Sequence, residues 1–330
     1  MLSRIKNVDP LIVLIILAVV VAIIAPVRGE FAEWFALATN LAIALLFFLY
    51  GARLSTSEAL KGLTNWKLHL TILAFTFVLY PIVGVLLRPL TLFISDGLYQ
   101  GILYLTLVPS TVQSSVAFTS IARGNVSGAI VAASLSNLAG VFFTPLLVMF
   151  IMGAGDGIHV DAQVFIDIAL LLLLPFVLGQ LARYFIPGVA GAAASKATKV
   201  VDRGSITMVV YSAFSSGMVA GVWSSVAVWE VIFLVVFSAL LVVFMLWLTR
   251  VISARLGFPR GDVIAIEFCG SKKSLATGLP MASVIFGGAS LGLLILPLMI
   301  YHQVQLMICS WLAARYGRAD DARNQSTALA

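Results

Sequence analysis

The sequence predicts an all-helical membrane protein with ten transmembrane helices, and three observations support this fold class. Hydrophobic residues make up 61% of the 330-residue chain, charged residues only 10%, and the mean hydropathy is +1.09. A soluble globular domain carries about 25% charged residues. The apolar residues recur in blocks of about 17–25, the length that spans a hydrocarbon core, where the backbone must be helical. Basic residues are concentrated in alternate connections between these blocks.

The apolar blocks predict the positions of the helices. No small-residue cleavage site follows the first apolar run, so this run is expected to be a retained helix and not a signal peptide. Residues 315–330 are expected to form a polar cytoplasmic tail, without regular structure from Arg318 onward. The predicted helices are 10–27, 33–52, 67–87, 97–123 (interrupted), 126–152, 160–186, 204–224, 229–252, 260–286 (interrupted) and 288–314.

The distribution of Lys and Arg predicts the orientation in the membrane. With these helices, 16 of the 20 basic residues fall on the side of the N-terminus, and only Arg28 and Arg88 fall on the other. Basic residues accumulate in cytoplasmic loops. Both termini are therefore expected in the cytoplasm, in a multi-pass protein of the bacterial inner-membrane type. Basic loops also account for the net charge of +6 without a nucleic-acid partner.

Two halves of five helices each are expected on either side of a short turn at Gly153–Gly157. Because five is odd, the second half, residues 156–314, enters the membrane from the face opposite to the first half, residues 1–155. This is the topology of an inverted repeat. The fourth helix of each half carries a polar run in mid-span, at residues 109–116 (PSTVQSSV) and 267–274 (EFCGSKKS).

Polar runs of this kind predict a binding site. A helix that unwinds in mid-membrane exposes carbonyl groups to cations and a half-helix N-terminus to anions. Pro109 removes a backbone donor, and Gly270 loosens the backbone, so breaks are expected near both. In the alternative interpretation, the serine and threonine hydroxyls only bond back to their own helices.

Three ionisable residues in the ninth predicted span point most directly to function. Glu267, Lys272 and Lys273 lie within seven positions. Each charge at the bilayer centre costs on the order of 2.5–3.5 kcal/mol on translocon scales, so these groups need partners, water or a ligand. We expect Lys272 to neutralise Glu267, and Lys273 to face the substrate cavity. In the alternative interpretation, all three residues lie in a cytoplasmic loop.

Other candidates are fewer. His302 with Gln303 and Gln305 forms a polar patch within the last span, and a proton-relay role for it stays open. Zinc-ligand spacings, phosphate-binding glycine loops and nucleophile motifs are absent from the sequence, so an enzyme is not expected. Cys269 and Cys309 both lie in apolar context and indicate no disulfide framework.

The sequence resembles the bile acid:sodium symporter superfamily over about residues 5–315. It is most similar to the SBF-like branch, which includes the orphan seventh member of the vertebrate bile-acid carrier family. The resemblance rests on residues 4–10 (RIKNVDP), on Ser114-Ser115-Val116 followed by 122–125 (ARGN), and above all on 267–278 (EFCGSKKSLATG).

The resemblance implies an architecture and a set of sites. Helices four and nine would be broken and cross in a core domain, beside a panel domain of helices one, two, six and seven. In sodium-coupled relatives the crossing binds two sodium ions. Glu267 matches the carboxylate that both sites share, and Ser114 and Ser115 match a Ser-Asn pair of the first site.

The chain departs from this pattern at several positions. Ala129 and Ala133 stand where relatives complete the first sodium site with Ser and Thr, and Thr76 stands where a Gln serves the second. Ser271 and Lys272 replace a Gln-Asn pair. A lysine ammonium group is a tethered cation and can occupy charge space that sodium would otherwise fill.

The sequence thus predicts a secondary active transporter of a small organic anion that works by alternating access. Sodium or protons would drive it at the crossing of helices four and nine, and sodium is the only cofactor implied. The alternative is a regulatory or scaffolding membrane protein with a relict transport site. Glu267, Ser114, Ser115, Thr76 and Ser271 are expected to bind the cation. The residues expected to bind substrate or compensate charge are Lys272, Lys273, Gln113 and Ser274.

Overall fold

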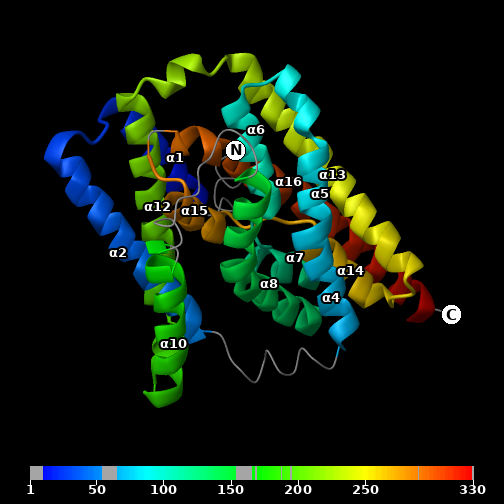
Figure 1. Ribbon diagram of the computed structural model, residues 1–330. Helices are drawn as coiled ribbons and strands as arrows, with labels where there is room; N and C mark the ends of the chain where they lie inside the picture. The colour runs from blue at the N-terminus through cyan, green and yellow to red at the C-terminus, as the bar shows by residue number, and fades with distance from the viewer. Residues whose placement is uncertain are drawn as a thin grey trace, which may run out of the picture. The chain divides into compact units, whose positions relative to one another are not determined.

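The structure, a computed structural model, describes residues 10–53, 65–153 and 166–328 apart from 168, 187, 194 and 289. The described chain is built from helices and contains no strand, as predicted (Figure 1). Its α-helices are α1 (Pro10–Ile24), α2 (Gly29–Arg53), α4 (Trp66–Ala74), α5 (Tyr80–Leu86), α6 (Asp96–Leu107), α7 (Gln113–Ile121), α8 (Val126–Leu147), α10 (Leu174–Phe185), α11 (Val189–Ala193), α12 (Lys196–Val219), α13 (Val228–Arg255), α14 (Arg260–Gly270), α15 (Leu275–Ile285) and α16 (Leu291–Ala328).

Several of these helices continue into tighter or wider turns. Three π-helical segments are present in the described chain, and two 3-10 segments stand between helices. The π-helical segments are η3 (Phe75–Leu79), η5 (Val148–Met152) and η6 (Ala169–Leu173), and the 3-10 segments are η4 (Arg88–Leu92) and η7 (Val222–Ser225).

Helical structure is found in each of the ten predicted ranges, but two polar segments differ from the prediction. The seventh predicted helix, 204–224, begins earlier, since α12 starts at Lys196 within the expected connector. The tail is also helical as far as Ala328, so the expectation of irregular structure from Arg318 was wrong. Both segments contain Ala together with Arg or Lys, residues that favour helix even where the chain is polar.

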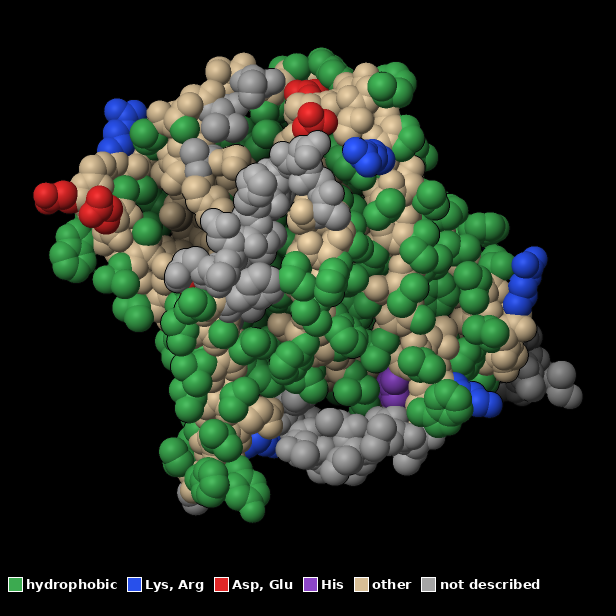
Figure 2. Space-filling view, in the orientation of Figure 1, with side chains coloured by type: hydrophobic (Ala, Val, Ile, Leu, Met, Phe, Trp, Pro, Cys, Tyr) green, Lys and Arg blue, Asp and Glu red, His purple; other side chains and the backbone are tan. Residues whose placement is uncertain are grey.

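Five helical stretches in the described ranges are long and apolar enough to cross a membrane. Hydrophobic side chains cover most of the face seen in Figure 2, and the few charged ones lie near its margins. Lipid contact explains why so much apolar surface is left outside the core. The five stretches are Gly29–Arg53, Trp66–Leu92, Val126–Met152, Val228–Arg255 and Leu291–Asp320, and the two shorter apolar helices are Val13–Ile24 and Ala169–Phe185.

The chain divides into two compact units, and each takes segments from both halves of the sequence. The helices that the resemblance assigns to a panel domain, α1, α2, α10 and α12, all fall in unit 1. Unit 1 comprises Met1–Ser55, Met152–Ala227 and Ala276–Leu296, and unit 2 comprises Thr56–Ile151, Val228–Leu275 and Pro297–Ala330. The division of the sequence into two repeats and a tail stays a prediction, and its boundary near residue 155 lies outside the described residues.

In unit 1, α2 and α10 lie side by side and approach each other at two glycines (Figure 1). A Cβ atom at Gly51 would lie 2.0 Å from the carbonyl oxygen of Phe176, and one at Gly179 would lie 2.0 Å from that of Phe48. Small residues let helix backbones approach closely in membranes. The contact is therefore reciprocal, since each helix provides a glycine for the other.

Side chains of α10 also bind the C-terminal end of α2. Arg183 donates from Nη1 to the carbonyl oxygens of Ala52 and Arg53 at 2.9 and 3.0 Å, and Gln180 donates to that of Gly51 at 2.6 Å. The last carbonyls of a helix have no partner within it and carry partial negative charge. A cation at this end stabilises α2 and fixes its position along α10.

In unit 2, the apolar core joins α4, α8 and α14. Ala129 and Ala132 present methyl groups to this core, and the thiol of Cys269 lies 3.8 Å from the carbonyl oxygen of Ala129. Ala129 and Ala133, both buried, thus stand where the resemblance implied hydroxyl ligands. The core residues are Leu68, Ile72, Phe75, Ala129, Ala132, Ala265, Ile266 and Cys269.

The ARGN segment connects the start of α8 to the start of α14. Asn125 caps α8, because its Oδ1 accepts from the backbone N–H of Gly128 at 2.8 Å. Its Nδ2 donates to Asp262 at 2.6 Å, and its backbone N–H donates to the Gly261 carbonyl at 2.9 Å. This part of the family resemblance therefore has a structural role.

We expect Gly51→Ala and Gly179→Ala each to destabilise the protein by about 1–3 kcal/mol, the cost of forcing extra atoms into a packed contact. Gly204 is the matched control, because it lies within α12 with no atom near its Cβ position. Gly204→Ala should leave the thermal unfolding midpoint unchanged or raise it. Equal midpoints for all three variants in detergent would contradict the close contact.

Candidate functional site

Both predicted helix interruptions are present, and they meet within unit 2. The first, residues 108–112, separates α6 from α7, and the second, residues 271–274, separates α14 from α15. The backbone N–H of Ser274 donates to the carbonyl oxygen of Pro109 at 2.8 Å. The two polar runs that the sequence singled out are therefore in direct contact.

Hydroxyl groups of the first interruption bind the end of α14. Ser110 donates from Oγ to the carbonyl oxygen of Cys269 at 2.5 Å, and Ser115 donates to that of Phe268 at 3.1 Å. These carbonyls lie in the last turn of α14, where helical partners run out. The alternative in which these serines only bond back to their own helix is wrong for both.

Side chains of α8 form hydrogen bonds with other backbone groups at the first interruption. Ser136 accepts from the backbone N–H of Ser110 at 3.1 Å, and Asn137 donates to the Ser110 carbonyl at 2.8 Å. Thr144 donates to the carbonyl of Leu107 at 2.9 Å. The sequence analysis did not assign these three residues, although polar side chains inside an apolar helix could have signalled them.

The charged residues of the second interruption are buried. Every residue from Asp262 to Leu275 is buried, and Lys272 and Lys273 have no exposed surface. The alternative in which Glu267, Lys272 and Lys273 lie in an exposed loop is therefore wrong. Their charges must be balanced by neighbouring groups or by a ligand.

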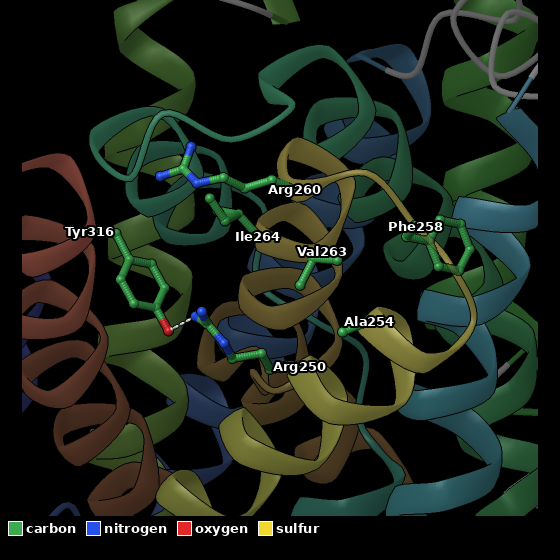
Figure 3. A pocket seen from close by; sticks show the side chains of 7 residues that line it. All are labelled: Arg250, Ala254, Phe258, Arg260, Val263, Ile264 and Tyr316. Carbon is green, nitrogen blue, oxygen red and sulfur yellow. Dashed lines mark hydrogen bonds between the residues drawn. The ribbon is translucent and has the colours of Figure 1, made fainter. Parts of the chain in front are cut away.

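Glu267 is paired with residues that the sequence analysis did not single out. Nη1 of Arg250, from the last two turns of α13, lies 3.4 Å from its Oε2, and the hydroxyl of Tyr316, from α16, donates to its Oε1 at 3.0 Å. Arg250 also bonds to the Tyr316 hydroxyl (Figure 3). The three side chains form a closed triangle.

The expected pairing of Lys272 with Glu267 was wrong. Ser271 donates from Oγ to the Glu267 carbonyl at 2.5 Å, and its backbone keeps helical angles at the C-cap of α14. Five positions along a helix turn a side chain by about 140°, so Lys272 points away from Glu267. Unwinding begins too late in the sequence to bring the two groups together.

Lys273 binds backbone carbonyls and does not face a cavity. Its Nζ donates to the carbonyl oxygens of Thr76, Thr106 and Val108 at 2.9, 2.8 and 2.9 Å. It also lies 4.1 Å from the centre of the Tyr80 ring. The expectation that Lys273 faces the substrate cavity was therefore wrong.

The backbone of Lys273 is held by Gln305 of α16. Its N–H donates to Oε1 of Gln305 at 2.9 Å, and its carbonyl accepts from Nε2 at 2.8 Å. Nε2 of Gln305 is also 2.9 Å from Nδ1 of His302. The polar patch of the last helix thus holds the second interruption in place, and the proton-relay role stays untested.

Lys272 lies among aromatic rings. Its Nζ is 4.0 Å from the centre of the Phe118 ring and 5.5 Å from that of Phe268. Among the residues that the structure describes, no group forms a hydrogen bond with this ammonium group. Ring faces attract a cation, but they do not replace hydrogen-bond acceptors or a counter-charge.

The remaining predicted site residues lie around the two interruptions. Ser114 and Ser115 both bond to the hydroxyl of Thr111, at 2.7 and 2.9 Å. Thr76 donates from Oγ1 to the Ile72 carbonyl of its own helix at 2.8 Å and contributes only its carbonyl to Lys273. Gln113 is exposed at the start of α7. The carbonyl oxygen of Ser271 accepts hydrogen bonds from the hydroxyl groups of Tyr80 and Tyr301.

A pocket of about 300 Å³ lies between the end of α13, the start of α14 and Tyr316 (Figure 3). Arg250 and Tyr316, the two partners of Glu267, form part of its wall. Arg260, at the start of α14, adds a second guanidinium group and pairs with Asp320 at 3.1 Å. The lining residues are Arg250, Ala254, Phe258, Arg260, Val263, Ile264 and Tyr316.

Interrupted apolar helices, with buried charges where the interruptions meet, are typical of a membrane transporter. The SBF-like CPA transporter family matches residues 9–318, and the chain belongs to this family. YfeH of Escherichia coli, a proposed symporter, is 43% identical over 332 residues, which cover 97% of each chain. Sodium/bile acid cotransporter 7 of Danio rerio is 30% identical over 282 residues, 83% of this chain and 82% of its own.

We expect Arg250→Gln to destabilise the protein by about 1–3 kcal/mol, because it removes the cation that faces the buried Glu267 carboxylate. Adding Glu267→Gln should restore most of this loss, since the charge is then removed as well. Arg255→Gln is the control, because Arg255 lies exposed on the same helix, in the last turn of α13. Thermal unfolding midpoints that fall additively in the double variant would contradict the ion pair.

Proposed function

We propose that this protein is a secondary active transporter of an organic anion that works by alternating access. Sodium or protons drive it at the place where the two helix interruptions meet. The chain is a multi-pass protein of the cell membrane, with ten spanning helices in two inverted repeats and both termini in the cytoplasm. The strong asymmetry of basic residues across its connections supports this topology.

The buried ammonium group of Lys272 carries the proposal for the substrate. It has no exposed surface and no hydrogen-bond partner among the described residues, and two phenyl rings flank it. Burying an uncompensated charge in an apolar site costs roughly several kcal/mol of free energy. A bound anion would compensate the charge of Lys272 and so stabilise the protein. The rings supply an apolar surface for the organic part of the same molecule.

Burial of Lys272 supports alternating access. An anion can reach a fully buried ammonium group only if the packing around it opens. Phe118, on α7, and Phe268, on α14, pack against each other close to the meeting interruptions, with their ring centres 6.1 Å apart. A small change in the position of these half-helices would expose Lys272 to one side of the membrane at a time.

Glu267 is the proposed site of the coupling cation. It is the buried carboxylate of the site, and the pocket beside Arg250 and Tyr316 offers a route from solvent. An incoming cation would take the place of the Arg250 guanidinium, which lies 3.4 Å away on a half-exposed side chain. Ser114, Ser115, Thr76 and Ser271 then act as supporting residues. The names of the relatives, which combine symport with sodium, favour sodium.

The proposed topology can be tested with reporter fusions. Fusions after Lys61 and after Lys196 should report a cytoplasmic location, and fusions near Asp156 and Glu230 an external one. The expectation follows from the distribution of basic residues. A reporter at the C-terminus that is active outside the cell would rule out the ten-helix arrangement.

Transport can be tested in proteoliposomes with taurocholate and a panel of small carboxylates as probes. Glu267→Gln should abolish uptake driven by a sodium or proton gradient, because it removes the carboxylate that binds the coupling cation. Lys272→Met should instead weaken anion binding at least tenfold, a loss of about 1.4 kcal/mol. Anion-induced thermal stabilisation measures the second effect without a gradient.

The two variants separate the proposal from its alternatives. Uptake that is unchanged in Glu267→Gln would refute the cation site, and anion binding that is unchanged in Lys272→Met would refute the anion site. Glu33→Gln on α2 and Lys67→Met on α4 are the matched controls, because they make the same chemical changes at exposed side chains. A wild-type protein that transports and binds none of the probes would favour a regulatory protein with a relict site.

A further inference from the structure

The ammonium group of Lys273 lies inside a shell of backbone oxygens. Three carbonyl groups, those of Thr76, Thr106 and Val108, surround Nζ at 2.8–2.9 Å. An ammonium group has three N–H donors and no acceptor, so each carbonyl receives one hydrogen bond. The face of the Tyr80 ring lies beside the same nitrogen, at 4.1 Å. This group is fully coordinated, unlike that of Lys272.

The first of these carbonyls is available because of a proline. Thr76 lies in the π-helical segment η3, where a carbonyl accepts from the residue five positions ahead. That residue is Pro81, which has no N–H. The donor four positions ahead, the N–H of Tyr80, is already bonded to the carbonyl of Phe75. Within its own helix, the Thr76 carbonyl therefore has no donor at either distance.

The other two carbonyls are available because α6 ends there. The N–H four positions after Thr106 belongs to Ser110, which donates to Ser136, and the N–H three positions ahead is missing at Pro109. Val108 is extended, with φ −79° and ψ 157°, and lies beyond the last residue of α6. Carbonyls at a helix C-terminus also carry partial negative charge.

We propose that these three carbonyls form a monovalent-cation site whose resident cation is the ammonium group of Lys273. Converging carbonyl oxygens at a broken helix are the ligands with which transporters coordinate sodium. The chain thus carries covalently one cation that it would otherwise have to bind from solution. Because this cation cannot leave with the substrate, it takes no part in the stoichiometry of transport.

This inference deepens the proposed function by separating two cation positions. At Glu267 the cation is a guanidinium on a half-exposed side chain beside a pocket, whereas at the carbonyl shell it is a fully buried ammonium group. The first can exchange with an ion from solution and the second cannot. The inference rests on the proposed function only for its role in coupling, since ion binding itself is measured without substrate.

The test is to remove the ammonium group and count the sodium ions that bind. Lys273→Ala vacates the shell, and radioactive sodium measured by equilibrium dialysis on the purified full-length protein should show one additional sodium per chain relative to wild type. Its thermal unfolding midpoint should be lower than that of wild type in choline chloride. It should recover as sodium replaces choline at constant ionic strength.

Two variants control for less specific effects. Lys273→Met keeps the length of the side chain, so its apolar end occupies the shell, and no additional sodium should bind. Lys272→Ala removes an equally buried ammonium group that has no carbonyl shell, and its sodium stoichiometry should match wild type. An additional sodium in Lys272→Ala but not in Lys273→Ala would contradict the proposal, because the cation site would then lie at Lys272.

Sodium stoichiometry equal to wild type in Lys273→Ala would overturn the proposal. A Lys273→Ala protein that is recovered folded in neither salt also counts against it, because sodium then does not replace the ammonium group. Neither outcome concerns the organic anion or its transport. Failure of this inference therefore leaves the proposed function standing, and failure of the transport test leaves the cation site standing.

Discussion

The site depends on one constraint, that backbone groups released inside a bilayer must find partners within the protein. Two apolar helical stretches are interrupted, and each interruption leaves N–H and carbonyl groups without helical partners. The Ser274–Pro109 backbone bond joins the two interruptions directly, and the hydroxyls of Ser110 and Ser115 bind the end of α14. Because each interruption satisfies the other, neither can be removed without exposing unpaired groups of its partner.

The three buried charges differ in how completely they are compensated, and this difference supports the role proposed for each one. Within the described part of the chain, Lys273 has a full set of acceptors, Glu267 has an ion pair and a hydroxyl donor, and Lys272 has only aromatic rings. A group that is fully satisfied has little free energy to gain from a ligand. The incompletely satisfied ammonium group has the most to gain, so a ligand is expected there.

The sequence was sufficient to predict the helical class, the places of the helices and the two interruptions. These features follow from apolar length, from proline and glycine, and from polar residues in apolar runs, all of which are local properties. The partners of Glu267 could not be predicted in this way. Arg250 is 17 positions away in the sequence and belongs to a different helix, α13, so no local pattern pairs it with Glu267.

The partners of the two lysines could not be predicted for a related reason. Their direction depends on where unwinding begins, and the bond from Ser271 to the Glu267 carbonyl keeps helical geometry up to that residue. The carbonyl shell of Lys273 is also assembled from Thr76 and from the end of α6, far away in sequence. Pro81 and Pro109 are visible in the sequence, and each lacks the N–H group that a carbonyl of its own helix would need. The convergence of these carbonyls on one point depends on the tertiary structure.

The pairing of Gln305 with Lys273 has a mechanical consequence. The amide of Gln305 forms hydrogen bonds with both backbone polar groups of one residue, as a residue of a neighbouring strand does in an antiparallel sheet. A carboxylate or an amine of the same length offers only acceptors or only donors, so neither can make both bonds. A slide of α16 by a single residue would carry the amide about 1.5 Å out of register and break the pair. From Pro297 onward, α16 and the second interruption are therefore expected to move as one rigid body. Any conformational change must then occur at other contacts.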